Sequence, residues 1–185
     1  SGCAYICYAP ESGSQKSLNI IKKRIKIDRL IKSIKSAVKI GHTVKLNFIL
    51  GFPHETLVDC LKTVFFGIYC SLRFGISDAI YSMFSPYPGS ELYEKLKKEK
   101  KINIDDNYFK KLMVYMDLTE SQSYSEHVSG KMLVFLRFAG FSLSYLAIYL
   151  SRPIRIYRLF KTFFKKDFFP NNLFEQRIYD FCVRL

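Results

Sequence analysis

The order of apolar and amphipathic segments over residues 1–100 constrains this chain most. Three short apolar runs typical of buried strands alternate with amphipathic segments of helical periodicity. Strands are expected at 4–9, 44–50 and 78–84, and helices at 15–23, 28–40, 56–73 and 90–100. Such alternation predicts parallel βαβ units and therefore an α/β fold.

Three strands are too few to close a barrel and few for an open sheet, so we expect further strands upstream of residue 1. The first nine residues already read as the interior of a buried strand, which favours the same expectation. The run 44–50 is nearly continuous in apolar residues, which predicts a strand covered on both faces.

Local signals fix several helix ends. Asp28 is the expected N-cap of the helix that ends at Gly41, and Thr56 with Asp59 has the spacing of a capping box. After residue 101 the character changes, with a short helix expected near 107–114 and an amphipathic one at 171–184.

The five cysteines are odd in number and irregular in spacing, which fits a reducing cytoplasm better than a secreted disulfide framework. Cys3 and Cys7 stand four residues apart. A three-cysteine cluster motif would need another cysteine where Pro10 stands. We therefore expect both to be small buried hydrophobes and not metal ligands.

Two loops leave strand ends with polar chemistry. In Glu11–Ser14, a carboxylate and hydroxyls suit a sugar diol or an amine, and Gly13 would let that ligand approach the backbone. A helix N-cap explains the same residues equally well. In the second loop Gly51 permits a sharp turn and Glu55 complements the next helix dipole. His54 is expected to be an exposed loop side chain.

Three segments in order resemble one family. They are Pro10–Ser14, then Asn47–Glu55 with the pattern Asn-x-Ile-x-Gly-x-Pro-x-Glu, then Ser85–Ser90. Together they resemble the radical S-adenosylmethionine superfamily, and most closely the branch with a cobalamin-binding domain that includes anaerobic magnesium-protoporphyrin ester cyclases. The resemblance implies the C-terminal half of a partial (β/α)6 TIM-like barrel at residues 1–104. A helical, basic and apolar extension would follow at 105–185.

The resemblance also implies site roles. Glu11 and Ser12 would contact the ribose or methionine part of S-adenosylmethionine. The backbone near Ile49 would lie along the adenine, with Gly51 giving it space, and Asn47 replaces the first glycine of the motif. The cofactor-binding residues expected on this basis are Glu11, Ser12, Asn47, Ile49, Gly51 and Glu55. Tyr81 and Phe84 would close the adenine side, with core packing the stronger expectation for at least one of them.

No Cys-x-x-x-Cys-x-x-Cys motif occurs in this chain. The resemblance therefore places the ligands of a [4Fe–4S] cluster, and any cobalamin domain, outside residues 1–185. We expect an enzyme in the parent protein and an inactive segment here, with the missing N-terminal half as its partner. No catalytic residue or metal ligand is assigned. The substrate would be a small molecule, apolar or porphyrin-like.

The net charge is +13, from 29 Lys and Arg against 16 Asp and Glu, which attracts polyanions. A/T-rich coding explains a Lys-, Ile- and Asn-rich composition equally well. The apolar run 132–150 nearly reaches the length of a bilayer span, and 152–166 is basic and aromatic.

Residues 132–166 therefore predict contact with an anionic membrane surface from the cytoplasm, while a helix buried against the barrel and a spanning helix stay open. No nucleic-acid-binding motif is present, so nucleic acid is not the expected partner. The alternative function is a non-catalytic module that associates with a membrane or a polyanion.

Overall fold

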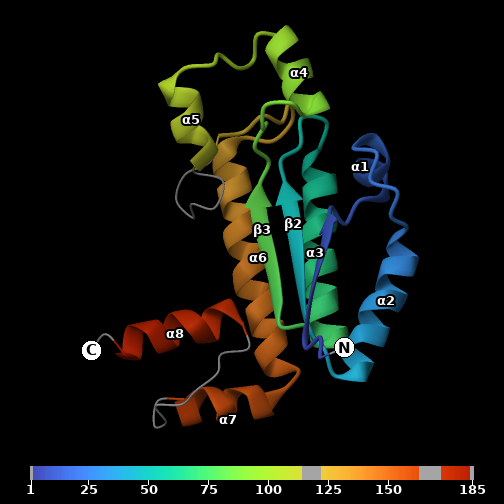
Figure 1. Ribbon diagram of the computed structural model, residues 1–185, viewed down its shortest axis with the longest axis vertical. Helices are drawn as coiled ribbons and strands as arrows, with labels where there is room; N and C mark the ends of the chain where they lie inside the picture. Colours follow the sequence, from blue (N-terminus) through green and yellow to red (C-terminus); the bar gives the residue numbers. More distant parts are fainter. Residues whose placement is uncertain (1, 114–121, 163–171, 184–185) are drawn as a thin grey trace.

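A parallel three-stranded sheet organises the computed structural model, which describes residues 2–113, 122–162 and 172–183 (Figure 1). The strand order is β1-β2-β3, with β1 at Tyr5–Glu11, β2 at Thr43–Leu50 and β3 at Asp78–Met83. Both neighbouring pairs are parallel. The α/β class and all three strands predicted from the sequence are confirmed.

A helix follows each strand, and the elements described after β3 are all helices. Their bounds are α1 Gln15–Ile20, α2 Ile27–Ile40, α3 Leu57–Phe74, α4 Glu91–Lys98, α5 Asp106–Met113, α6 Gly130–Leu150, α7 Pro153–Thr162 and α8 Leu173–Val183. Thr56 and Asp59 form the predicted capping box of α3, and Gly41 ends α2 with a φ of 100°. Asp28 is not a cap. The helix begins earlier, after Lys26, and Asp28 lies in its first turn, where its charge complements the helix dipole.

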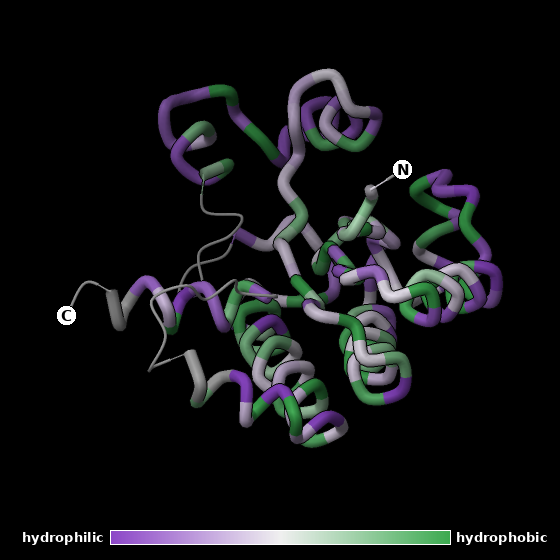
Figure 2. Tube along the Cα trace, turned by 60° about the horizontal axis from the view of Figure 1, so that its bottom comes forward, coloured by the Kyte–Doolittle hydropathy of each residue, from purple (hydrophilic) through white to green (hydrophobic). Residues whose placement is uncertain are grey.

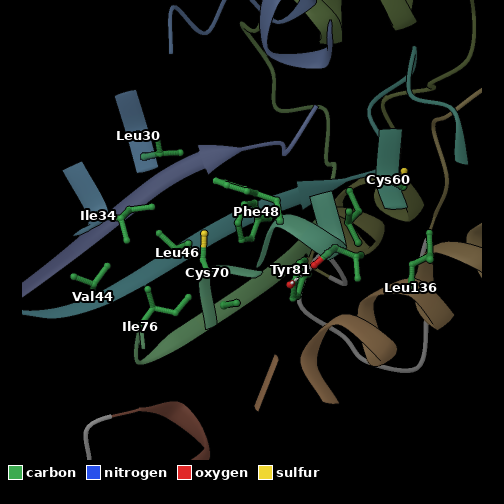
Figure 3. Packing of buried hydrophobic residues seen from close by; sticks show 14 of the residues in the cluster. Leu30, Ile34, Val44, Leu46, Phe48, Cys60, Cys70, Ile76, Tyr81 and Leu136 are labelled. Atoms are coloured by element: carbon green, nitrogen blue, oxygen red, sulfur yellow. Dashed lines mark hydrogen bonds between the residues drawn. The ribbon is translucent and has the colours of Figure 1, made fainter. Parts of the chain in front are cut away.

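Helices α3 and α6 pack side by side on one face of the sheet (Figure 1). Tyr81 of β3 lies at the centre of this layer. Its ring stacks on Phe48, and its hydroxyl donates to the Val64 carbonyl at 3.2 Å and lies 3.0 Å from Ser144 Oγ of α6 (Figure 3). Gly67 admits the hydroxyl, because a Cβ there would overlap it. One residue thus joins both helices to the sheet.

The opposite face of the sheet is only partly covered. Along β2, Val44, Leu46 and Phe48 are buried toward the helices, while the alternate side chains Lys45 and Asn47 are partly exposed. The expectation that this strand is covered on both faces is therefore wrong. Its buried face carries only large apolar side chains, and its open face carries Lys45 and Asn47 together with Ile49.

The two N-terminal cysteines also differ from expectation. Cys3 and Cys7 are both exposed, because Cys7 lies on the face of β1 that no helix covers and Cys3 precedes the strand. The prediction that they are buried hydrophobes is wrong.

Helix α6 belongs to the core of the molecule. Leu133 and Leu136 join the same apolar cluster as the sheet, together with Val128 before the helix, and Arg137 is 1% exposed. One apolar core therefore includes residues from both sides of position 104, where the sequence predicted the start of the C-terminal extension. In the part of the chain that the structure describes, α6 is also the one helix with the length and composition to cross a membrane.

Arg152, just before α7, and Arg155, within it, bind the end of α3. Arg152 donates to the Phe74 carbonyl at 3.1 Å, and Arg155 donates to the carbonyls of Gly75 and Ile76 at 2.8 and 2.9 Å. Cations at the C-terminus of a helix stabilise it by satisfying its free carbonyls. The basic character of the predicted tail therefore has a structural cause. Residues 163–166 of that tail lie outside the described residues.

Candidate functional site

A cleft of about 510 Å³ opens on the uncovered face of the sheet, where the three strands end. The strands supply its floor and the segments at the end of α1 and the start of α4 supply its rim. Ligands of parallel α/β folds bind at this end of the strands, and the volume lies in the range of small-molecule sites. Among its lining residues are Ala9, Glu11, Asn47, Ile49, Phe52, Ser82 and Phe84.

Glu11 reaches the cleft through an irregular strand end. The pairing of β1 with β2 shifts between Tyr8 and Glu11, so three residues of β1 oppose two of β2. Glu11 has a φ of 67°, in the left-handed region that an L-residue with a long side chain rarely adopts. Lys23 Nζ lies 2.7 Å from its carboxylate. Backbone strain of this kind concentrates at functional sites.

Asn47 and Ile49 form the floor beside Glu11. The Asn47 amide donates to Cys7 Sγ at 3.3 Å, while its Oδ1 is buried and accepts no hydrogen bond from the described residues. A buried acceptor without a donor costs free energy, and a ligand donor placed in the cleft would satisfy it. Phe52 and Phe84 add an aromatic wall with ring centroids 5.1 Å apart.

Glu55 lies behind the cleft and not in it. Its carboxylate is fully buried and accepts hydrogen bonds from the backbone N–H groups of Gly51 and Phe52 at 3.0 and 3.2 Å, and from Ser12 Oγ at 3.1 Å. Burial raises the pKa of Glu55, against the lowering effect of these donors. Glu55 thus ties the β2–α3 loop to the loop after β1.

Ser12 and Gly51 likewise do not line the cleft. Ser12 is fully buried between Glu55 and Thr63, whose hydroxyl lies 3.0 Å away. Gly51 has a φ of 86°, and a Cβ there would meet the end of the Leu133 side chain in α6. Three of the six predicted cofactor residues, Glu11, Asn47 and Ile49, therefore face the cleft, and the other three hold its loops in place.

Gly13 serves a different purpose from the one the sequence suggested. A Cβ at Gly13 would lie 2.6 Å from the Lys62 carbonyl and 2.8 Å from the Thr63 Cα, so the glycine lets α3 approach the loop. The Gly13 N–H also donates to Thr63 Oγ1 at 2.9 Å. The expectation that this glycine gives room to a ligand is replaced by a packing role.

A second carboxylate, Asp59, anchors the same loop. Ser14 Oγ donates to it at 2.8 Å and Thr56 donates at 2.8 Å from its hydroxyl. Burial alone would raise the pKa of Asp59, but the hydrogen bonds from Thr56 and Ser14 lower it below its usual range. The N-cap reading of Ser14 is also correct, since its hydroxyl caps α1.

His54 is partly buried and stacks on Phe52 with ring centroids 5.8 Å apart, so it is not the exposed loop side chain that the sequence suggested. Desolvation lowers the pKa of His54 and favours its neutral form. Beside it, Ser125 Oγ donates to the Glu55 carbonyl at 2.8 Å. A segment 70 residues further along the chain therefore supports this loop.

The rim carries an ion pair that the sequence did not indicate. Lys22 Nζ, just after α1, lies 2.6 Å from the Glu91 carboxylate at the start of α4. Both side chains are exposed, so the pair is weak in free energy, but it spans the mouth of the cleft. Of the two aromatic residues expected near the adenine, Phe84 lines the cleft, whereas Tyr81 is fully buried in the core.

The side chains that line the cleft suit a polar organic ligand. A carboxylate, an amide oxygen without a donor and an aromatic wall can hold a ribose or amine, a hydrogen-bond donor and a flat ring. Within the described ranges no three His, Cys, Asp or Glu side chains converge in a way that would hold a metal ion. The lining side chains therefore suit an organic ligand, and the ligands of an iron–sulfur cluster stay a prediction about residues outside this chain.

Known proteins give a partial match. No family model matches the chain. It is 33% identical over 93 residues to an uncharacterized methyltransferase of Pyrococcus horikoshii, a match that covers 50% of this chain and 19% of the relative. It is 34% identical over 88 residues to a protein of Methanocaldococcus jannaschii named as a methylthiotransferase, covering 48% and 19%. The chain thus spans about a fifth of the length of these relatives and is similar to them over half of its own.

Proposed function

We propose that this chain forms one side of the S-adenosylmethionine pocket of a radical S-adenosylmethionine enzyme that transfers a methyl or methylthio group. The observation that carries the proposal is the cleft at the ends of three parallel strands, with Glu11, Asn47 and Ile49 on its floor. The names of the two relatives, a methyltransferase and a methylthiotransferase, support a donor of this kind.

Each lining residue has a role in this proposal. Glu11 accepts hydrogen bonds from the ribose hydroxyls or the amino group, and its ion pair with Lys23 orients the carboxylate. Asn47 Oδ1 accepts from the exocyclic amine of the adenine, and Ile49 and Phe84 pack on the ring. Ser12, Gly51 and Glu55 act as positioning residues.

In the parent enzyme a [4Fe–4S] cluster held by residues outside this chain would supply the electron that cleaves the sulfonium. Cobalamin is a further cofactor of the same proposal, bound on another domain. The residues described here contribute binding and orientation. The apolar wall excludes water from one side of the nucleotide, and the strained backbone at Glu11 fixes where its carboxylate points.

Equilibrium titration of the protein with S-adenosylmethionine, followed by calorimetry, tests the proposal. Glu11→Gln and Asn47→Leu should each weaken binding about ten-fold, the cost of about one charge-assisted or buried hydrogen bond. Glu94→Gln is the matched control, because Glu94 is exposed on α4 and does not line the cleft. Equal affinity in all four proteins, or no binding by any, rejects the proposal.

A further inference from the structure

The outward faces of α3 and α6 carry large apolar side chains that no described element covers. Phe65 of α3 is 62% exposed and Phe135 of α6 is 63% exposed. Because the two helices pack side by side, these faces form one surface, and hydrophobic colour follows both helices in Figure 2. We call it the outer helical surface; its residues are Val58, Phe65, Tyr69, Leu72, Met132, Phe135, Leu143, Leu146 and Leu150.

This surface lacks negative charge. Asp59 is the one acidic residue in the sequences of α3 and α6, and it is buried beneath the α1 loop. The exposed charges along these helices are cations such as Arg73 and Lys131. The solvent-exposed face of an ordinary helix pair carries both positive and negative side chains. The outer helical surface differs, because it is apolar and has no exposed acid.

Helix α2 borders the surface with further cations. Arg29, Lys32, Lys35 and Lys39 are exposed along α2. Lys35 Nζ lies 5.4 Å from the centroid of the Phe74 ring at the end of α3, which places this basic side of α2 against α3. Arg152, just before α7, and Arg155, within it, instead bind backbone carbonyls. The charge beside the apolar surface therefore comes from α2.

We propose that the outer helical surface docks on an anionic lipid bilayer, with the apolar side chains in the interface and the α2 lysines over the headgroups. Amphipathic surfaces of this composition bind where apolar burial and attraction to anionic lipid act together. The helices lie flat, because α6 buries its other face, Arg137 included, against α3 and β3. The cleft lies on the opposite face of the sheet and stays in water.

Charge favours a bilayer over a second copy of this chain. The net charge is +13, and a copy would bring a second border on which the four cations of α2 outnumber its one acid, Asp28. Like charges brought together in an interface oppose association, whereas phosphate headgroups neutralise them. Lipid is therefore the occupant that fits both the apolar and the basic part.

A single-tryptophan reporter locates the contact, since the sequence has no Trp. Phe135→Trp should show a blue-shifted emission when the full 185-residue chain is mixed with vesicles of phosphatidylglycerol and phosphatidylcholine. Phe109→Trp is the matched control, because Phe109 is 51% exposed on α5, which is not part of the outer helical surface (Figure 1). Emission that shifts for both proteins, or for neither, overturns the proposal.

Vesicle co-sedimentation then measures the energetics. The double variant Phe65→Gln with Phe135→Gln should bind anionic vesicles at least ten-fold more weakly than the wild type, while Phe109→Gln binds like the wild type, with unchanged circular dichroism in all. Added salt and pure phosphatidylcholine should each reduce wild-type binding. Equal binding to both lipids, or dimerisation in solution that the double variant abolishes, overturns the proposal.

Discussion

At the scale of single residues, Glu55 shows how a site motif can serve structure. Its carboxylate faces away from the cleft and satisfies two backbone N–H groups of the loop and the Ser12 hydroxyl. Glu55→Ala should lower the free energy of unfolding by about 3 kcal/mol, because buried donors would lose their acceptor. Urea unfolding followed by circular dichroism measures the loss. A change below about 1 kcal/mol would contradict this role for the carboxylate.

The raised pKa of Glu55 predicts an unusual pH dependence. Burial makes the folded protein hold this proton more tightly than the unfolded chain, whose pKa is near 4.5. Its contribution to stability is therefore greatest below that pKa and falls as pH rises through the folded value. Glu55→Gln stays neutral, and its amide oxygen still accepts from the two backbone N–H groups while its NH2 donates to Ser12 Oγ, so the variant should remove this fall. When unfolding free energies are measured from about pH 4 to pH 8, the wild type should lose stability relative to Glu55→Gln as the pH rises.

The chemistry of the loops was predictable from the sequence, but the direction of each side chain was not. Glu11, Asn47 and Ile49 line the cleft, since they lie near the ends of their strands on the open face of the sheet. The partners of Ser12 and Gly13 lie 43 to 51 residues away on α3 and its N-terminal loop, so sequence spacing alone did not reveal them. Long-range hydrogen bonds decide which polar residue points inward.

At the scale of elements, an arginine of α7 anchors that helix to the end of α3. Arg155 donates to two carbonyls just beyond α3, at Gly75 and Ile76. Arg155→Ala should cost about 2 kcal/mol of unfolding free energy, since charged hydrogen bonds to buried acceptors are lost. Arg73→Ala removes the same charge from an exposed position in α3 and should cost less than about 0.5 kcal/mol. Equal losses in thermal denaturation would show that only net charge matters.

Element positions followed the sequence closely because hydrophobic periodicity dominates them. The run of α2 from Leu30 to Ala37 buries one face as its spacing predicts. The errors came where tertiary contacts decide. The exposure of Cys7 and the two-sided character of β2 depend on which sheet face receives helices, and no local pattern states that.

At the scale of the whole molecule, Asp78 at the start of β3 connects the sheet to the helices α6 and α8. Its buried carboxylate accepts from Tyr145 Oη of α6 at 2.7 Å and from the Leu173 N–H of α8 at 3.2 Å. Burial raises the pKa of Asp78. Asp78→Ala should release α8 first, so amide exchange in 173–183 should rise at least ten-fold while β2 stays protected, about 1.4 kcal/mol of local stability. Uniform loss of protection would assign Asp78 a global role instead.

The extra residue in β1 has a consequence for protein evolution. Regular pairing after Tyr8 would put Pro10 opposite Phe48, yet Glu11 stands there. Deleting one residue between Tyr8 and Glu11 would restore the regular ladder. The glutamate side chain would then turn toward the apolar helix layer, the side on which Pro10 is now buried. A descendant of this gene that lost one codon here would need an apolar residue in place of the glutamate. Among related sequences, those that have the extra residue in this strand should therefore have the acidic side chain, and those that lack the extra residue should have an apolar one.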